Sequence, residues 1–411
     1  MTIVEFIQAY WTYLTIPVVS SLVGFATNWL AVKMMMYPAE FKGIGNIGWQ
    51  GIIPANARKM ARIVVTHSLE RVITQQELIS RIKSQELIAA IHHRIDPLVE
   101  DVVDEVMTQT SNYGIHVSNF FWSAAPVWVK AKVYREVRNR LPEALEKIIA
   151  DIKTETEELL DLNHLIAENL GNNKQLLIEV FLKSAAREFR FIQNSGFYFG
   201  FPLGIPVMFI WYFFPVWWLL PIFGLFVGYI TNKLALYLVQ KPLNPKKIGP
   251  FTIQGLFIKR QKEVSRYYGQ LFATRLVTAE VLSNELFRKE ETLKRIHDLI
   301  YRQVSHSIES SQGPFKPFTV ISMGPKEYAK VNHIVTDKAF TELKYPDKRS
   351  LSYIDKAFDI EETIAERVGN LPPEEFFELL HPIIEEDEWK LIAVGAALGF
   401  CAGICQWLLL T

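Results

Sequence analysis

The stretch FYFGFPLGIPVMFIWYFFPVWWLLPIFGLFVGYITNKLALYLV, residues 197–239, decides the fold. Its only charged residue is Lys233, and about 20 apolar residues are enough to cross the hydrocarbon core of a bilayer. Pro215 and Pro221 interrupt the stretch near its middle, where aromatic residues typical of a membrane–water interface also gather. We therefore predict a hairpin of two transmembrane helices, 197–213 and 216–239.

Two further regions are nearly free of charge, about 11–36 and about 390–410. The first is expected to be an uncleaved span, because it lacks the basic start of a signal peptide. Apolar residues recur near a 3.6-residue period in the polar segments 38–196 and 240–388, which indicates helix, and 318–323 is the one short strand candidate. We predict an all-α membrane protein with four transmembrane helices and two long helical segments.

Basic residues flank the spans on the side of the two polar segments. Lys42 and Arg58 follow the first span, Lys183 precedes the second, and Lys241 follows the third. Because Lys and Arg near span ends stay in the cytoplasm, both segments are predicted to be cytoplasmic and both termini to lie outside. The expected location is the bacterial inner (plasma) membrane.

Composition excludes several classes of function. The chain has 411 residues, 44 basic and 44 acidic, so its net charge is zero, and the mean hydropathy is +0.11. A nucleic-acid partner is not expected, because such proteins usually carry a basic surplus. Two cysteines and scattered histidines form no metal-ligand pattern, and no catalytic or nucleotide-binding motif occurs. We expect no metal, no cofactor and no enzymatic activity.

The sequence repeats itself after about 200 residues. Gly24-Phe-Ala-Thr-Asn-Trp-Leu-Ala31 matches Gly228-Tyr-Ile-Thr-Asn-Lys-Leu-Ala235, and segment 161–168 resembles segment 359–366. This predicts two halves, 1–214 and 215–411, each built as span, cytoplasmic helical segment and span. Two crossings per half make the pseudo-repeats parallel, related by an axis along the membrane normal.

Both halves carry three glycines at four-residue spacing in their second span. Such glycines form a flat strip on one helix face, where two backbones can approach closely in lipid. We predict helix packing at Gly196, Gly200, Gly204, Gly395, Gly399 and Gly403.

The repeated Thr27-Asn28 and Thr231-Asn232 pairs lie inside predicted spans. A polar side chain in hydrocarbon must find a partner or line a wet cavity. Two interpretations follow: a paired substrate or ion site at the pseudo-twofold axis, or hydrogen bonds between helices.

Glycine-rich apolar segments follow the first and third spans, at 43–54 and 246–255, with basic residues directly after them. One interpretation is a membrane-surface loop whose basic residues contact lipid headgroups. The other is a turn that redirects the chain into the cytoplasmic helices. The predicted headgroup contacts are Arg58, Lys59, Lys259 and Arg260.

These segments together resemble one family, the YheB-like bacterial membrane proteins known as domain of unknown function 445. The resemblance lies in residues 24–31 with Pro38, in 50–54, in 196–200 and in 388–406. It implies a multi-pass membrane protein with long helical segments, and it brings no activity, cofactor or catalytic residue. The central hairpin and the two complete halves depart from a plan with terminal anchors only.

Two functional hypotheses follow. The first is a non-enzymatic inner-membrane protein that binds or transfers lipid, or scaffolds the envelope, through amphipathic helices. Its partners would be membrane lipid and either a second copy or an envelope protein. The alternative is a transporter or channel for a small solute or ion, with Asn28 and Asn232 at its site.

Overall fold

A computed structural model describes residues 3–45, 47–65, 72–109, 122–155, 160–311 and 325–410. The chain forms two compact units. The span unit comprises Met1–Val72, Ile166–Phe272 and Glu361–Thr411, and the second unit comprises Ile73–Leu165 and Ala273–Ile360.

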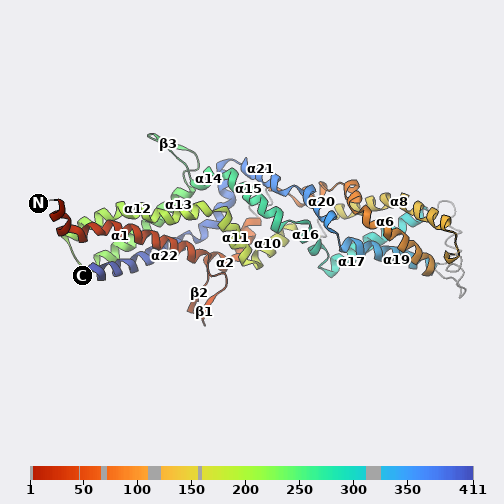
Figure 1. Cartoon of the computed structure of the whole chain (residues 1–411), viewed down its shortest axis with the longest axis horizontal. Helices are drawn as coiled ribbons and strands as arrows, with labels where there is room; N and C mark the ends of the chain where they lie inside the picture. Colours follow the sequence, from red (N-terminus) through yellow and green to blue (C-terminus); the bar gives the residue numbers. More distant parts are fainter. Residues whose placement is uncertain are drawn as a thin grey trace. The chain divides into compact units, whose positions relative to one another are not determined.

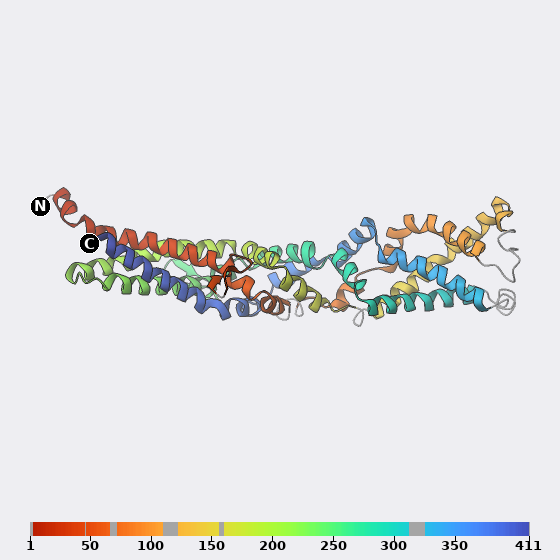
Figure 2. The same cartoon turned by 90° about the horizontal axis from the view of Figure 1, so that it is seen from below.

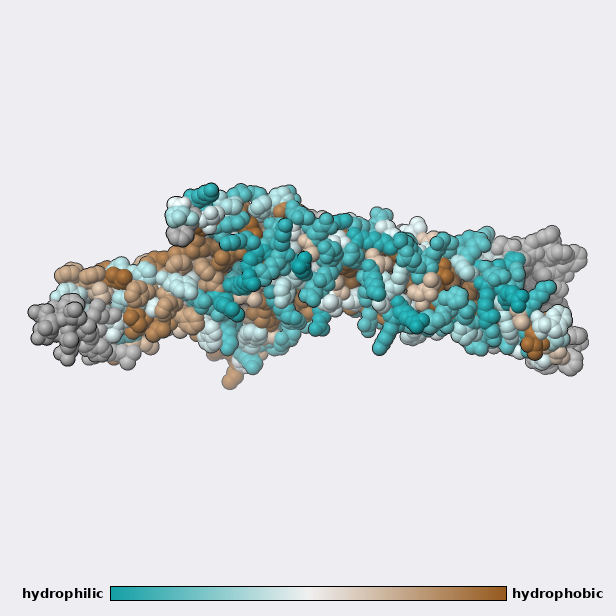
Figure 3. All heavy atoms as spheres, turned by 45° about the horizontal axis from the view of Figure 1, so that its top comes forward, coloured by the Kyte–Doolittle hydropathy of each residue, from teal (hydrophilic) through white to brown (hydrophobic). Residues whose placement is uncertain are grey.

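Four long helices form the span unit: α1 (Ile3–Met36), α12 (Ala186–Phe213), α13 (Leu219–Gln240) and α22 (Pro373–Leu410). They lie side by side in both views of Figures 1 and 2. Each contains a stretch long and apolar enough to cross a membrane, and Figure 3 shows hydrophobic surface gathered over them. The predicted all-α membrane protein with four spans is therefore confirmed.

The helix boundaries differ from the prediction where polar turns extend the apolar part. α12 begins at Ala186 and α22 at Pro373, both well before their apolar stretches. α13 begins at Leu219, so Pro221 lies in its first turn, where the missing N–H costs no helical hydrogen bond. Hydropathy identifies the part of a helix in lipid, and it leaves polar extensions undetected.

A small β-hairpin follows each of α1 and α13. Strand β1 (Lys42–Ile44) pairs antiparallel with β2 (Ile47–Trp49), and β3 (Lys246–Ile248) pairs antiparallel with β4 (Phe251–Ile253). Neither hairpin was predicted from the sequence, because three-residue strands are too short to show a period-2 pattern. The signal present was a turn glycine, Gly45 or Gly249, and both have positive φ near 60°.

Short helices complete the span unit. They are α2 (Ile52–Ala55), α3 (Ala57–Val64), α11 (Lys174–Ser184), α14 (Leu256–Lys259) and α15 (Gln261–Leu271). Three elements contain unit boundaries: α10 (Leu162–Asn172), the π-helix η2 (Phe272–Leu276) and α21 (Ile360–Gly369).

The second unit consists of helices in its described part. They are α5 (Gln75–Ser80), α6 (Ser84–Gln109), α8 (Val127–Thr154), α16 (Ala279–Leu286), α17 (Glu290–Ser311), α19 (Pro325–Lys344) and α20 (Lys348–Phe358). Ile148 of α8 packs with Ile296, Leu299, Ile300 and Val304 of α17. The strand candidate 318–323 lies outside the described residues.

The compact units cut across the predicted halves, since each half contributes to both units. Elements nevertheless follow in the same order after α1 and after α13: a hairpin, a four-residue helix and a longer helix. Thr74 and Thr278 also cap the next helices alike, each accepting a hydrogen bond from the backbone N–H three residues later. The duplication itself stays a prediction.

Candidate functional site

The contact between α1 and α12 is made by backbone. A Cβ atom added to Gly196 would lie 2.0 Å from the carbonyl oxygen of Gly24. Gly200 and Gly204 face Ser20 and Pro17 in the same way, at 2.7 Å from backbone atoms. The order of these contacts makes the two helices antiparallel. Only glycine allows two helices to approach this closely. The close approach increases van der Waals packing, which stabilises helix pairs in lipid, where the hydrophobic effect does not drive association.

α13 and α22 make an equivalent contact. A Cβ on Gly399 would lie 2.2 Å from the Gly224 carbonyl oxygen, and one on Gly403 would lie 2.4 Å from that of Leu220. Gly228 and Gly395 also meet here. All six predicted packing glycines therefore face a partner helix. Packing roles for the opposing Gly24, Gly224 and Gly228 were not predicted, because these glycines do not form a run of three at four-residue spacing.

The two asparagines form hydrogen bonds between helices. The Nδ2 of Asn28 donates to the Ile192 carbonyl oxygen at 2.9 Å, and that of Asn232 donates to the Leu391 carbonyl oxygen at 3.0 Å. Both side chains are 0% exposed. Ser195 lies 3.4 Å from the Asn28 amide nitrogen. Each asparagine thus joins one helix pair, as in the second of the two interpretations above.

The adjacent threonines bond within their own helices. Thr27 donates from Oγ1 to the Gly24 carbonyl oxygen at 3.1 Å, and Thr231 donates to that of Gly228 at 3.3 Å. This satisfies a hydroxyl in lipid without any partner helix. The threonines therefore need no ligand to be buried.

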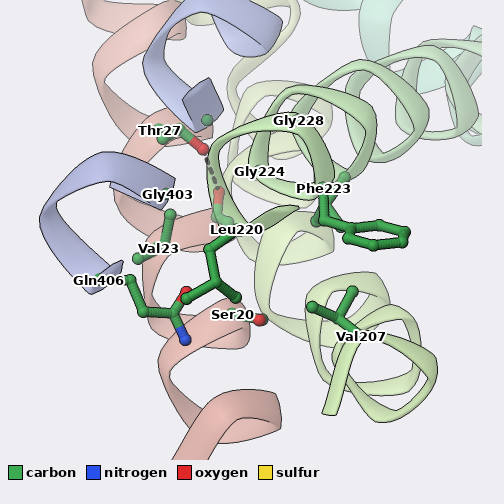
Figure 4. Close-up of a pocket in the computed structure, with 13 residues that line it drawn as sticks. Ser20, Val23, Thr27, Val207, Leu220, Phe223, Gly224, Gly228, Gly403 and Gln406 are labelled. Carbon is green, nitrogen blue, oxygen red and sulfur yellow. Dashed lines mark hydrogen bonds between the residues drawn. The ribbon is translucent and has the colours of Figure 1, made fainter. Parts of the chain in front are cut away.

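A small cavity lies inside the four-helix bundle (Figure 4). Its polar lining comes from Ser20 and Thr27 of α1 and Gln406 of α22, and its apolar walls include Val207 and Phe223. The cavity has a volume of about 20 Å³. That volume holds a water molecule, whereas sites for small organic ligands are several hundred Å³. Thr27 lines this cavity, whereas the other three polar residues predicted in the spans, Asn28, Thr231 and Asn232, are not in its lining.

Arg260 forms ion pairs inside the protein, and its predicted headgroup contact stays a prediction. Its Nη1 donates to both carboxylate oxygens of Glu188 at 2.7 Å, and Glu263 accepts from Nε and Nη2. The side chains of Arg260 and Glu188 are 14% and 3% exposed. The hydrogen bonds to Glu263 and to Glu188 hold the pKa of the Arg260 guanidinium above its ordinary value. The sequence could not reveal this partner, because Glu188 precedes Arg260 by 72 positions.

The other three basic residues lie on the surface. Arg58, Lys59 and Lys259 are all exposed, on or beside the short helices that follow the hairpins. Headgroup contact by these three stays a prediction. Within the described ranges, no three His, Cys, Asp or Glu side chains group together in a way that could hold a metal ion.

The asparagines give a prediction that separates a packing role from a joint site. Asn28→Leu and Asn232→Leu should each lower the free energy of unfolding by about 0.6–2 kcal/mol, the usual size of such bonds in membranes. The double variant should show the sum, because the two bonds join different helix pairs. Thermal unfolding in mild detergent measures this, and Asn139→Leu on the exposed face of α8 is the control. Strong non-additivity would instead favour a joint site.

Similarity to known proteins is partial. The chain is 32% identical over 87 residues to a UPF0754 membrane protein of Staphylococcus epidermidis, which covers 20% of this chain and 23% of that protein. It is 25% identical over 162 residues to a UPF0754 membrane protein of Thermosynechococcus vestitus, covering 36% and 39%. A Staphylococcus aureus relative is 32% identical over 84 residues, covering 20% and 22%.

The chain therefore matches between about a fifth and two fifths of the length of these relatives. No protein-family model matches it, and no solved structure does. The name of the relatives states a membrane location and no activity. It agrees with the four apolar helices, and together they place this chain among membrane proteins.

Proposed function

We propose that this chain is a non-enzymatic, multi-pass protein of the bacterial inner membrane that scaffolds the cell envelope. Its four spans anchor the chain, and its helical segments offer a surface to an envelope protein or to a second copy. The closed interior of the span unit carries this proposal. Both helix pairs are in backbone contact, and the cavity beside Ser20 and Gln406 has a volume of about 20 Å³.

The orientation follows from charge. Exposed Lys42, Arg58 and Lys241 lie just beyond the ends of α1 and α13, and such residues favour the cytoplasmic side. The segments between α1 and α12 and between α13 and α22 share a side, because two crossings separate them. Both helical segments are then cytoplasmic.

The family assignment belongs to the same proposal. The stretches that carry the resemblance to the YheB-like membrane proteins include residues 24–31 and 196–200, which form the contact between α1 and α12. An internal duplication is supported by the matching contacts of Asn28 and Asn232.

Scaffolding fits the second unit better than lipid transfer does. A lipid-carrying groove needs a continuous, open apolar lining. In the described part of the second unit, the large exposed apolar side chains are Val127, Trp128 and Tyr345, whereas the core around Ile300 is closed. Contact with membrane lipid is therefore assigned to the span unit.

A second candidate function is conduction of water or a small ion. The polar lining of the cavity favours it, because the Nε2 atom of Gln406 is buried and has no hydrogen-bond partner among the described residues. Asn28 and Asn232 are not part of this lining, so the path would differ from the one that sequence analysis expected.

Flux measurements separate the two functions. Full-length protein in sealed liposomes should pass protons and potassium ions no faster than protein-free liposomes. A flux that Gln406→Leu abolishes, and that the outward-facing Leu408→Ala leaves intact, would overturn scaffolding in favour of conduction.

Photo-crosslinking in cells provides the positive test. A crosslinking amino acid at Trp128 or at the exposed Glu146 of the second unit should yield adducts of defined mass. The same group at Phe226, on the exposed face of α13, should yield none with soluble-domain partners. Two differently tagged copies distinguish a self-contact from an envelope partner. Absence of adducts from both second-unit positions would contradict a scaffold.

A further inference from the structure

The two β-hairpins are fixed to the ends of spans. α1 ends at Met36 and β1 starts at Lys42, and the hairpin closes where the Gly51 N–H donates to the Pro38 carbonyl oxygen at 2.9 Å. The Gln50 side chain adds a bond to the Ala39 carbonyl oxygen at 2.7 Å. These hydrogen bonds hold the base of the hairpin next to the end of α1.

The second hairpin is held in the same way. The Gly255 N–H donates to the Pro242 carbonyl oxygen at 2.9 Å, and Gln254 donates to that of Leu243 at 3.0 Å. In Figure 1 the two hairpins leave the span unit sideways, in opposite directions across the run of the long helices. If the helices cross the bilayer, the hairpins run along its surface.

The first hairpin carries its large side chains on one face. Its register pairs Lys42 with Trp49 and Ile44 with Ile47, so these four side chains share a face. The opposite face consists of the Gly43–Gly48 pair. Ile44 is 90% exposed and Ile47 is 85% exposed. Both isoleucines are therefore almost fully exposed at the tip of the hairpin.

The second hairpin has the same antiparallel register as the first. Its register pairs Lys246 with Ile253 and Ile248 with Phe251. In the sequence, a lysine again starts the first strand, and Ile248 and Phe251 are the residues on either side of the turn. Gly45 and Gly249 open the two turns with φ of 61° and 60°, a conformation that favours glycine. The sequence pattern of a basic residue at the start and apolar residues beside the turn thus occurs twice, after two different spans.

Charge distinguishes the bilayer from other occupants of this face. Lys42, Lys246 and Lys247 are exposed, which suits anionic headgroups. The acidic residue beside the first hairpin, Glu40, is paired with Lys174 at 2.7 Å. Trp49 donates from Nε1 to the Met34 carbonyl oxygen at 3.2 Å, at the end of α1, and tryptophan is typical of the membrane interface.

We propose that each hairpin inserts its apolar tip into the interfacial region of the bilayer beside its own span. Ile44 and Ile47 reach the upper acyl chains, and Lys42 stays at the level of the phosphates. The two hairpins then act as lateral anchors that fix the depth and rotation of the bundle. This inference depends on the membrane location alone, so it is independent of whether the chain scaffolds or conducts.

Spin-label accessibility tests the inference in the full-length protein. Ile47→Cys is labelled with a nitroxide in a Cys401→Ala/Cys405→Ala background, in nanodiscs of phosphatidylethanolamine and phosphatidylglycerol. Glu146→Cys is the control for water, and Phe226→Cys is the control for lipid. We expect severalfold more collision with oxygen, relative to a water-soluble nickel chelate, at position 47 than at 146. The depth should correspond to about 5–10 Å within the interface.

Two outcomes would overturn the inference. Accessibility at position 47 equal to that at 146 would show a hairpin in water. Protection from both reagents, relieved by dilution with unlabelled protein, would show contact with a second copy. Phe251→Cys in the second hairpin repeats the measurement independently, so a misfolded Ile47→Cys protein leaves the test intact.

Discussion

Gly196→Ala should destabilise the protein, although alanine is the better helix former. The propensity gain is about 1 kcal/mol at most. The new methyl group would lie 2.0 Å from the Gly24 carbonyl oxygen, where no flexible side chain can yield. The two helices must separate, and overpacking of this kind costs about 1–3 kcal/mol or more. Thermal unfolding in mild detergent, followed by tryptophan fluorescence, should show a lower midpoint.

A matched glycine provides the control. A Cβ on Gly369 would lie 3.8 Å from the Ser265 side chain, an ordinary contact, so Gly369→Ala should leave the midpoint unchanged or raise it. Gly399→Ala should resemble Gly196→Ala, because its methyl group would lie 2.2 Å from the Gly224 carbonyl oxygen. A Gly196→Ala protein that melts at or above the parent temperature would refute the backbone contact.

The spans and their packing faces could be predicted from sequence because both depend on local pattern. Apolar runs mark the part of each helix in lipid, and glycines at four-residue spacing share a helix face whatever lies opposite. Asn28 and Asn232 were recognised as residues that need a partner, but the choice between a ligand and the Ile192 or Leu391 carbonyl oxygen required the fold.

The remaining features depend on contacts that no local pattern encodes. The cavity combines Ser20, Val207, Phe223 and Gln406 from four different helices. The hairpins consist of strands too short for a periodic signal, and they are recognisable afterwards by the glycines at their turns. Each compact unit combines segments that lie far apart in the chain. The sequence repeat indicates that the two halves resemble each other, but it does not indicate which segments pack into the same unit.

Arg260 and Lys259 are neighbours in sequence, but we expect them to contribute differently to stability. Replacing each by methionine should therefore change the free energy of unfolding by different amounts. Arg260→Met leaves the carboxylate of Glu188, 3% exposed, without the Nη1 group that donates to both of its oxygens. Breaking a buried pair in this way costs about 3–5 kcal/mol. Lys259 is exposed, so Lys259→Met should change the free energy of unfolding by less than about 0.5 kcal/mol. Thermal unfolding of both variants gives the comparison.

The effect on lipid binding should be the reverse of the effect on stability: Lys259→Met should change it and Arg260→Met should not. If Lys259 contacts headgroups, Lys259→Met weakens binding of phosphatidylglycerol by about 1 kcal/mol, whereas Arg260→Met leaves the lipid preference unchanged. The double variant Glu188→Leu/Arg260→Met replaces the pair by apolar side chains and should recover most of the lost stability, because no charge is then buried alone. Native mass spectrometry of bound lipid provides the affinity. A stable Arg260→Met protein that loses phosphatidylglycerol would support the predicted headgroup contact of Arg260 and would contradict a stabilising role of the ion pair.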